Sequence, residues 1–251
     1  LLTYTLPADG QGEGERGRSG NHNMKQKRIL TPTEGPQSWK RLLAEPEKHW
    51  QPGYSAMSTA FSWENADGIP REIASLFAHA EEPAIRDASL AIAIPEYKVS
   101  LAGGTRPSQN DVFAVLASSG GLITVMVEGK AREDFDNLLG DWKKRTSPQG
   151  VRARLADIAE HIGLSTQIPD EIRYQLLHRT ASAVIEARRF RAPFAAMIVQ
   201  SFVYDDKENH YDDFCAFLGL YGKPATKGKL IELTVCKGCR LFAAWVQSKP
   251  K

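Results

Sequence analysis

The sequence has few of the features that mark whole classes of protein. No apolar run comes near the roughly 18–20 residues that a membrane-spanning helix needs. The opening residues Leu1–Leu6 are too short for a signal peptide and lack its basic start. Three cysteines in 251 residues are too few for a disulfide framework. We therefore expect a cytoplasmic protein in a reducing compartment.

Charge is nearly balanced, and the sequence lacks the motifs of several common sites. The 32 basic and 30 acidic residues leave a net charge of +2, so composition alone does not indicate a nucleic-acid partner. The sequence contains no glycine-rich phosphate loop, no Ser-His-Asp order and no zinc finger, and its six histidines form no ligand set. Function must therefore be inferred from a few side chains on predicted elements.

The cysteines allow two interpretations. Cys236 and Cys239 have metal-like spacing, but no second pair of this kind completes a zinc site, and Cys215 and His210 are only the nearest further ligands. A Lys-Gly dipeptide separates the two cysteines, and alternating apolar runs flank them. This pattern predicts the turn of a β-hairpin. A zinc or redox protein stays open as a minor alternative, which metal analysis would test.

The chain divides into an unusual start and one larger unit. Residues 1–30 include a polar, glycine-rich stretch, Gly10–Gly20, which cannot bury enough surface to offset the cost of ordering. We expect this extension to be disordered or non-native, with Met24 as a candidate start. Over the whole sequence, 42% of the residues are apolar and 25% are charged, as is usual for globular proteins. Residues 31–251 are predicted to form a single domain with a core at about 55–203.

Apolar periodicity changes along this domain. Helical spacing begins at Ser55, a candidate N-cap, and Gly68 is a candidate stop. Helices are predicted over 55–66, 70–77, 132–144, 151–162, 171–188 and 211–218. Strands are predicted over 96–101, 111–117, 121–127 and 193–202, with a C-terminal accessory hairpin within 222–248. The first three strands form an antiparallel meander, so we predict an α/β fold with a mixed sheet flanked by helices.

The most specific constellation lies on this meander. Glu128 and Lys130 are two residues apart on one strand and so project from the same face. Asp111 opens the neighbouring antiparallel strand, and the hairpin can bring its carboxylate toward them. Two carboxylates and a lysine beside apolar runs suit Mg²⁺, which takes hard oxygen ligands. The metal would activate a water for attack on a phosphate, and the lysine would position that water.

This arrangement resembles the PD-(D/E)XK (restriction-endonuclease-like) nuclease superfamily. Asp111 stands at the first acidic position, and Glu128-Gly-Lys130 forms the acid-x-Lys triplet. Ser108-Gln109-Asn110 replaces the literal proline before the aspartate, although Pro107 is close. The expected element order matches the superfamily core over about 55–203. The stretches 127–135 and 173–179 are also similar to an uncharacterised bacterial family within it.

The resemblance implies a metal-dependent nuclease that hydrolyses phosphodiester bonds, most readily in DNA, in restriction, defence or repair. Asp111 and Glu128 would bind Mg²⁺, with Mn²⁺ as a substitute, and both would be catalytic together with Lys130. Many members carry a further acid on the preceding helix, which Glu64 matches best and Glu72 second, so Glu64 is expected to add to the metal shell. Gln175 matches a glutamine of related exonucleases and is expected to be catalytic as well. A homodimer would suit double-strand cutting.

Basic side chains supply a candidate nucleic-acid surface. A polar row on the predicted helix 171–188 includes Gln175 and Arg179, which could border the cleft and contact phosphate. The proposed nucleic-acid contacts are Arg179, Arg188, Arg189, Lys223, Lys227 and Lys229. Two other interpretations remain: the arginines at 188–191 complement a helix dipole, or the whole protein is a catalytically silent nucleic-acid-binding or interaction protein that retains the fold.

Overall fold

The computed structural model describes residues 29–204 and 210–250. The extension expected over residues 1–30, including Met24, lies outside these ranges except for its last two residues. Of those two, Ile29 forms a parallel bridge with Ala93 at the edge of the sheet.

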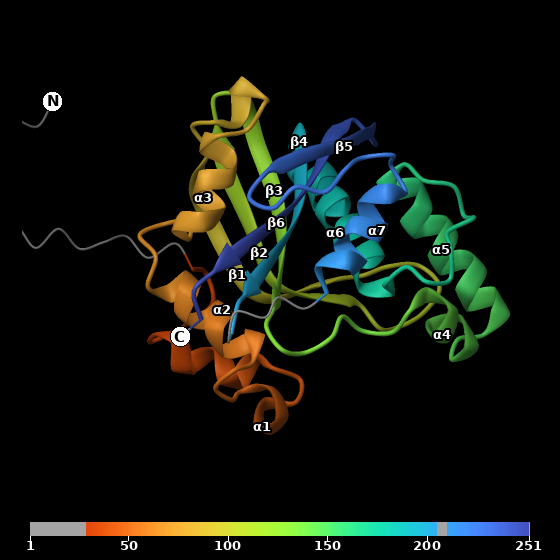
Figure 1. The fold of residues 1–251 in the computed structure, drawn as a ribbon, viewed down its shortest axis with the longest axis horizontal. Coiled ribbons are helices and arrows are strands. Elements are labelled where there is room, and N and C mark those ends of the chain that lie inside the picture. The colour runs from red at the N-terminus through yellow and green to blue at the C-terminus, as the bar shows by residue number, and fades with distance from the viewer. Residues whose placement is uncertain (1–28, 205–209, 251) are drawn as a thin grey trace, which may run out of the picture.

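A six-stranded mixed sheet forms the centre of the fold, in the order β1-β2-β3-β4-β6-β5 (Figure 1). The strands are β1 (Ser89–Val99), β2 (Ser108–Ser118), β3 (Gly121–Lys130), β4 (Phe194–Phe202), β5 (Leu230–Cys236) and β6 (Cys239–Ser248). The antiparallel β1-β2-β3 meander is confirmed, and β3, β4 and β6 run parallel to one another. The expected hairpin is present, but it is not an accessory, since β6 pairs with β4 within the central sheet.

Helices cover both faces of the sheet (Figure 1). One face carries α5 (Pro148–Ile162), α6 (Tyr174–Phe190) and α7 (Tyr211–Gly219), with the short α4 (Leu139–Lys144) beside them. The other face carries α2 (Ser55–Glu64) and α3 (Arg71–Ala78), preceded by the short η1 (Pro36–Leu42) and α1 (Pro46–His49); a short η2 (Pro83–Ile85) precedes β1. Apolar side chains on alternate faces of the strands form two cores, one under each helical layer. The α/β prediction is thus confirmed at this level.

Several element boundaries differ from the sequence-based expectation. Of the helix predicted over 132–144, only α4 forms. In the loop before α4, the backbone hydrogen-bonds to another part of the chain: the N–H of Asp136 donates to Gln175 Oε1 (3.2 Å). Phe135 is buried there against Trp245, so tertiary packing overrides helical propensity. Ser55 begins α2 and does not cap it, and the helix ends at Glu64, ahead of Gly68. The loop before α4 brings acidic side chains to the end of β3.

Candidate functional site

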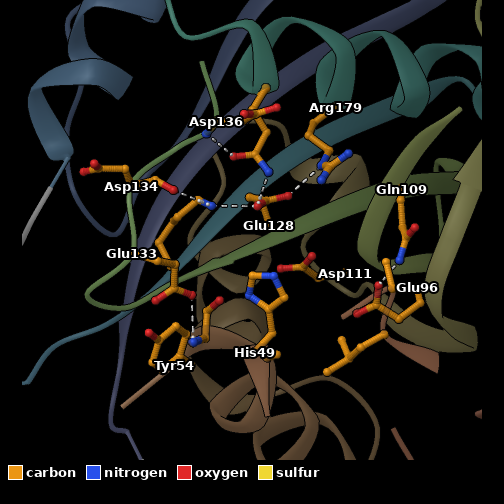
Figure 2. A pocket seen from close by; sticks show the side chains of 16 residues that line it. His49, Tyr54, Glu96, Gln109, Asp111, Glu128, Glu133, Asp134, Asp136 and Arg179 are labelled. Carbon is orange, nitrogen blue, oxygen red and sulfur yellow. Dashed lines mark hydrogen bonds and ion pairs between the residues drawn. The ribbon is translucent and has the colours of Figure 1, made fainter. Parts of the chain in front are cut away.

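Three carboxylates lie in register across the first three strands. Val112 pairs with Val127, so Asp111 and Glu128 are the next positions of the β2-β3 ladder. Glu96 occupies the equivalent position in β1, between the pairs that Pro95 and Tyr97 form with β2. Glu96, Asp111 and Glu128 thus lie in one row across the three strands, and all three line the same pocket (Figure 2).

This row lines a pocket of about 370 Å³ at the end of β3. The walls come from four parts of the chain: the segment from Leu43 to the start of α2, the strands, the loop at 133–136, and the first turns of α6. Figure 2 shows side chains from each part pointing toward the pocket. Gln175, Arg179 and Lys130 are all pocket residues, so the structure brings five of the predicted site residues together.

Glu128 is the most heavily bonded of the three acids. Its Oε1 accepts from Gln175 Nε2 (2.6 Å) and Lys130 Nζ (2.9 Å), and its Oε2 accepts from Arg179 Nε (2.6 Å). The side chain is only 3% exposed. Burial opposes ionisation, but the charges of Arg179 and Lys130 outweigh it and lower the pKa of Glu128. Glu128 is therefore an ionised carboxylate at neutral pH.

Asp111 is less well compensated. Its Oδ2 accepts the N–H of Gly129 (2.7 Å). Burial raises the pKa of Asp111 well above its ordinary value, and the charges of Glu128 and Glu96 raise it further. Arg179 and Lys130 counter this only in part. The pocket holds more potential negative charge than its two cations neutralise.

Glu96 is a site residue that the sequence analysis missed. Its Oε2 accepts from Gln109 Nε2 (2.6 Å), and burial raises its pKa to about 7. Its backbone φ is +52°, although it lies in the middle of a strand. Non-glycine residues rarely adopt this conformation, and strained backbone clusters at functional sites. No local motif marks Glu96, because only its register opposite Asp111 brings it to the pocket.

The glycine of the Glu-Gly-Lys triplet is required by close packing. A Cβ atom at Gly129 would lie 2.2 Å from Thr59 Oγ1, because α2 crosses the end of β3 there. The N-terminus of α2 is fixed beside the pocket by Glu133, whose Oε1 accepts the N–H of Ser55 (2.8 Å). Glu133 Oε2 is buried without a partner among the described residues. No sequence motif marks Glu133, which was expected inside the predicted helix over 132–144.

Glu64 does not reach this pocket. Its Oε1 accepts from Trp39 Nε1 (2.8 Å), and it does not line the cavity. Ser55, at the opposite end of α2, does line it, and nine residues of helix separate the two by about 13.5 Å. Glu72, the second choice, lines a different pocket. The prediction of Glu64 as a metal ligand is thus not supported by its position.

The basic residues proposed for nucleic acid are scattered. Arg179 forms a buried ion pair with Glu128 and is not a free phosphate contact. Arg188 and Arg189 lie in the last turn of α6, and Arg189 pairs with Glu186 (2.5 Å). Lys223, Lys227 and Lys229 are exposed between α7 and β5. Apart from Arg179, none of them lines the pocket.

A second layer of polar contacts holds Arg179 in place. Its Nη1 donates to Ser108 Oγ (3.1 Å), which also forms a hydrogen bond with His178 Nδ1 (2.8 Å). Burial lowers the pKa of His178 well below its ordinary value, and the charge of Arg179 lowers it further. A neutral imidazole beside a buried guanidinium adds no repulsion. This layer fixes the direction from which Arg179 approaches Glu128.

The cysteines and the acidic side chains give no preformed metal cage. Cys236 and Cys239 pair across the predicted hairpin turn, and both are free thiols, as is Cys215. Across residues 29–204 and 210–250, no group of three or more His, Cys, Asp or Glu side chains is arranged to hold a metal ion. Asp111 and Glu128 are thus a pair of oxygen donors whose pocket has an excess of negative charge.

The fold and pocket together define an α/β protein with a polar site at the end of a central strand. Among the helices of the described ranges, none is long and apolar enough to cross a membrane. Residues 32–250 match a family described as a domain of unknown function, DUF6946, and the chain belongs to this family. No curated protein and no solved structure matches the chain.

Proposed function

We propose that the pocket hydrolyses phosphodiester bonds in nucleic acid, with DNA as the expected substrate, on a restriction-endonuclease-like core. The observation that carries the proposal is the position of Asp111 and Glu128 on facing strands, with Lys130 two residues further on, around one pocket. The order of elements from α2 through β1-β2-β3 to α6 and β4 supports the same proposal.

The donor set fits Mg²⁺. Six acids and two cations, Lys130 and Arg179, line the pocket. The raised pKa values of Asp111 and Glu96 show that further positive charge would stabilise their ionised forms. Carboxylate oxygens are the ligands that Mg²⁺ takes, often one or two from the protein with several waters. Glu128 uses three of about four lone-pair positions for its donors, which leaves one. Bound Mg²⁺ would neutralise phosphate charge and lower the pKa of a water.

Lys130 is the residue proposed to act on the reacting groups. Its Nζ lies 2.9 Å from Glu128 Oε1 and 4.9 Å from the centre of the Phe135 ring. These contacts hold a cation at the wall of the pocket, where it can orient the nucleophile or stabilise charge that develops on the phosphate. Gln175 and Arg179 act as positioning residues through their bonds to Glu128.

A cleavage assay tests the proposal. Purified protein is incubated with plasmid, with single- and double-stranded DNA and with RNA, in Mg²⁺, Mn²⁺ or EDTA. We expect metal-dependent cleavage that falls about 10²–10³-fold in Lys130→Ala. Lys144→Ala is the matched control, because Lys144 lies on the surface of α4 in a local pair with Asp141. Wild-type protein that cleaves none of these substrates would contradict the proposal.

One observation favours a second candidate, a silent nucleic-acid-binding or interaction protein. Glu128 is already held by three donors, as in a site whose ion pair is only structural. In that case Asp111→Asn would leave all binding properties unchanged, and Mg²⁺ would not alter the thermal stability of the wild type. Metal-dependent stabilisation that Asp111→Asn removes would exclude the silent candidate.

A further inference from the structure

A second polar pocket lies further along α2 than the candidate site, beginning one helical turn after Ser55 and extending past Ser62. Ser55 and Ala56 line the first pocket, whereas Ser58 and Ser62 line the second, which has a volume of about 280 Å³. Its other polar walls come from the start of α3 and the end of β6, with Arg71, Glu72, Ser248 and Lys249. Nothing in the candidate reaction uses these residues.

Hydrogen bonds from Gln200 leave two hydroxyl groups of this pocket free to act as donors. Its Oε1 accepts from Trp63 Nε1 (3.2 Å), and because an indole nitrogen can only donate, the amide NH₂ must face the other way. That NH₂ donates to Ser62 Oγ (2.9 Å) and Ser248 Oγ (3.0 Å). Each hydroxyl accepts in these bonds and keeps its own proton to donate. No acceptor among the described residues takes either proton.

The charged side chains of the pocket also favour a ligand that accepts hydrogen bonds and carries negative charge. Arg71 and Lys249 are exposed, and within the described ranges neither forms an ion pair. Glu72 is the one carboxylate of the lining, so the walls carry a net positive charge. Two directed O–H donors and two cations make a site for an anion. A phosphate group offers acceptor oxygens to all four.

The location ties this pocket to the candidate site. Gln200 pairs with Gly129, the residue between Glu128 and Lys130, but its side chain reaches α2, whereas Glu128 bonds to α6 on the other face of the sheet. Helix α2 connects the two pockets, since Ser55 lines the first and Ser62, seven residues or about 10.5 Å further along the helix, lines the second. We propose that the second pocket binds a phosphate of the same nucleic-acid strand that enters the candidate site, further along that strand from the phosphate that is cleaved. This inference rests on the proposed nuclease function.

Binding in EDTA tests the inference apart from cleavage. The affinity of full-length protein for fluorescein-labelled single-stranded and duplex oligonucleotides is measured by anisotropy between 50 and 200 mM salt. Arg71→Gln should weaken binding about 3–10-fold and reduce the salt slope by about 1, because one phosphate contact is lost. Arg71→Lys should restore most of both. Arg152→Gln, an exposed arginine on α5, is the matched control and should change neither.

The serines give a different signature. Ser62→Ala combined with Ser248→Ala should weaken binding about 3–10-fold with an unchanged salt slope, since hydrogen bonds are lost but no charge is removed. Thermal unfolding checks that this double variant still folds. If it does not fold, the Arg71→Gln variant tests the inference alone, because Arg71 is exposed and its replacement leaves the core intact. Equal effects of Arg71→Gln and Arg152→Gln, or a wild type that binds no oligonucleotide, would overturn the inference. Binding that depends on Arg71, without cleavage in Mg²⁺ or Mn²⁺, would support phosphate binding in the second pocket and contradict the nuclease function alone.

Discussion

Replacing Arg179 with alanine should destabilise the protein, because it leaves the buried Glu128 carboxylate with only one of its two cationic partners, Lys130. Arg179 and Glu128 are 9% and 3% exposed, and the variant removes the donor to Glu128 Oε2. Breaking a buried ion pair by removing one partner costs about 3–5 kcal/mol. A protein of this size loses roughly 2–4 °C of melting temperature per kcal/mol. We therefore expect urea unfolding to show a loss of about 3–5 kcal/mol, and thermal unfolding a fall of about 6–20 °C.

The pH dependence follows from the same pair. The pKa of Glu128 is lowered in the folded protein, so its ionised form stabilises the fold above the ordinary carboxyl pKa, and this contribution is lost as pH falls through the lowered value. In Arg179→Ala we expect that pKa to rise, because only Lys130 then opposes the effect of burial. The difference in stability between variant and wild type should thus be smaller at pH 5 than at pH 8. Adding Glu128→Gln, which removes the charge that has lost Arg179, should recover about 1–3 kcal/mol. A loss below about 1 kcal/mol, as for a surface pair, or no recovery in the double variant, would refute the reasoning.

Three further predictions concern the neighbouring residues. Gly129→Ala should cost about 1–3 kcal/mol in urea unfolding, because its Cβ would overlap Thr59 Oγ1; Gly219→Ala, where no atom lies within 4 Å, should cost nothing. Glu96→Gln should raise the melting temperature at pH 8 but not at pH 4, because an acid whose pKa is raised to about 7 destabilises the fold once it must ionise; equal shifts at both pH values would contradict this. Mg²⁺ at about 100 times its Kd should stabilise the wild type by about 2.7 kcal/mol in thermal unfolding, and Asp111→Asn should remove the effect; an unchanged response would exclude Asp111 as a ligand.

Local patterns were sufficient to predict the elements that carry the centre of the site. Alternation in β2 and β3 places Asp111, Glu128 and Lys130 on adjoining strands, although β2 begins at Ser108 and Asp111 does not open it. The polar row of α6 brings Gln175 and Arg179 to the same pocket. These predictions depend on the period of a strand or a helix. That period is a property of the backbone and is visible in a single segment.

The residues that were missed depend on contacts between distant segments. Glu96 reaches the pocket through the pairing of β1 with β2 and a left-handed backbone, neither of which its neighbours in sequence encode. Glu133 lies in a loop that is held in place by α2 and α6 instead of the expected helix. Glu64 was expected near the metal only from the superfamily resemblance, whereas the end of α2 that lines the pocket is the one that begins at Ser55. Helix orientation is set by tertiary packing, which periodicity does not report.

The parallel pairing of β4 with β6 has a consequence for how the protein is synthesised. β4 emerges from the ribosome some 40 residues before β6, and until then its edge lacks the partner that it has in the sheet. Unpaired strand edges invite pairing with other chains. Ser248, which anchors Gln200, is also translated after nearly everything else around it. The newly made chain therefore passes through a stage with an aggregation-prone edge, during which chaperone binding to β4 would protect it.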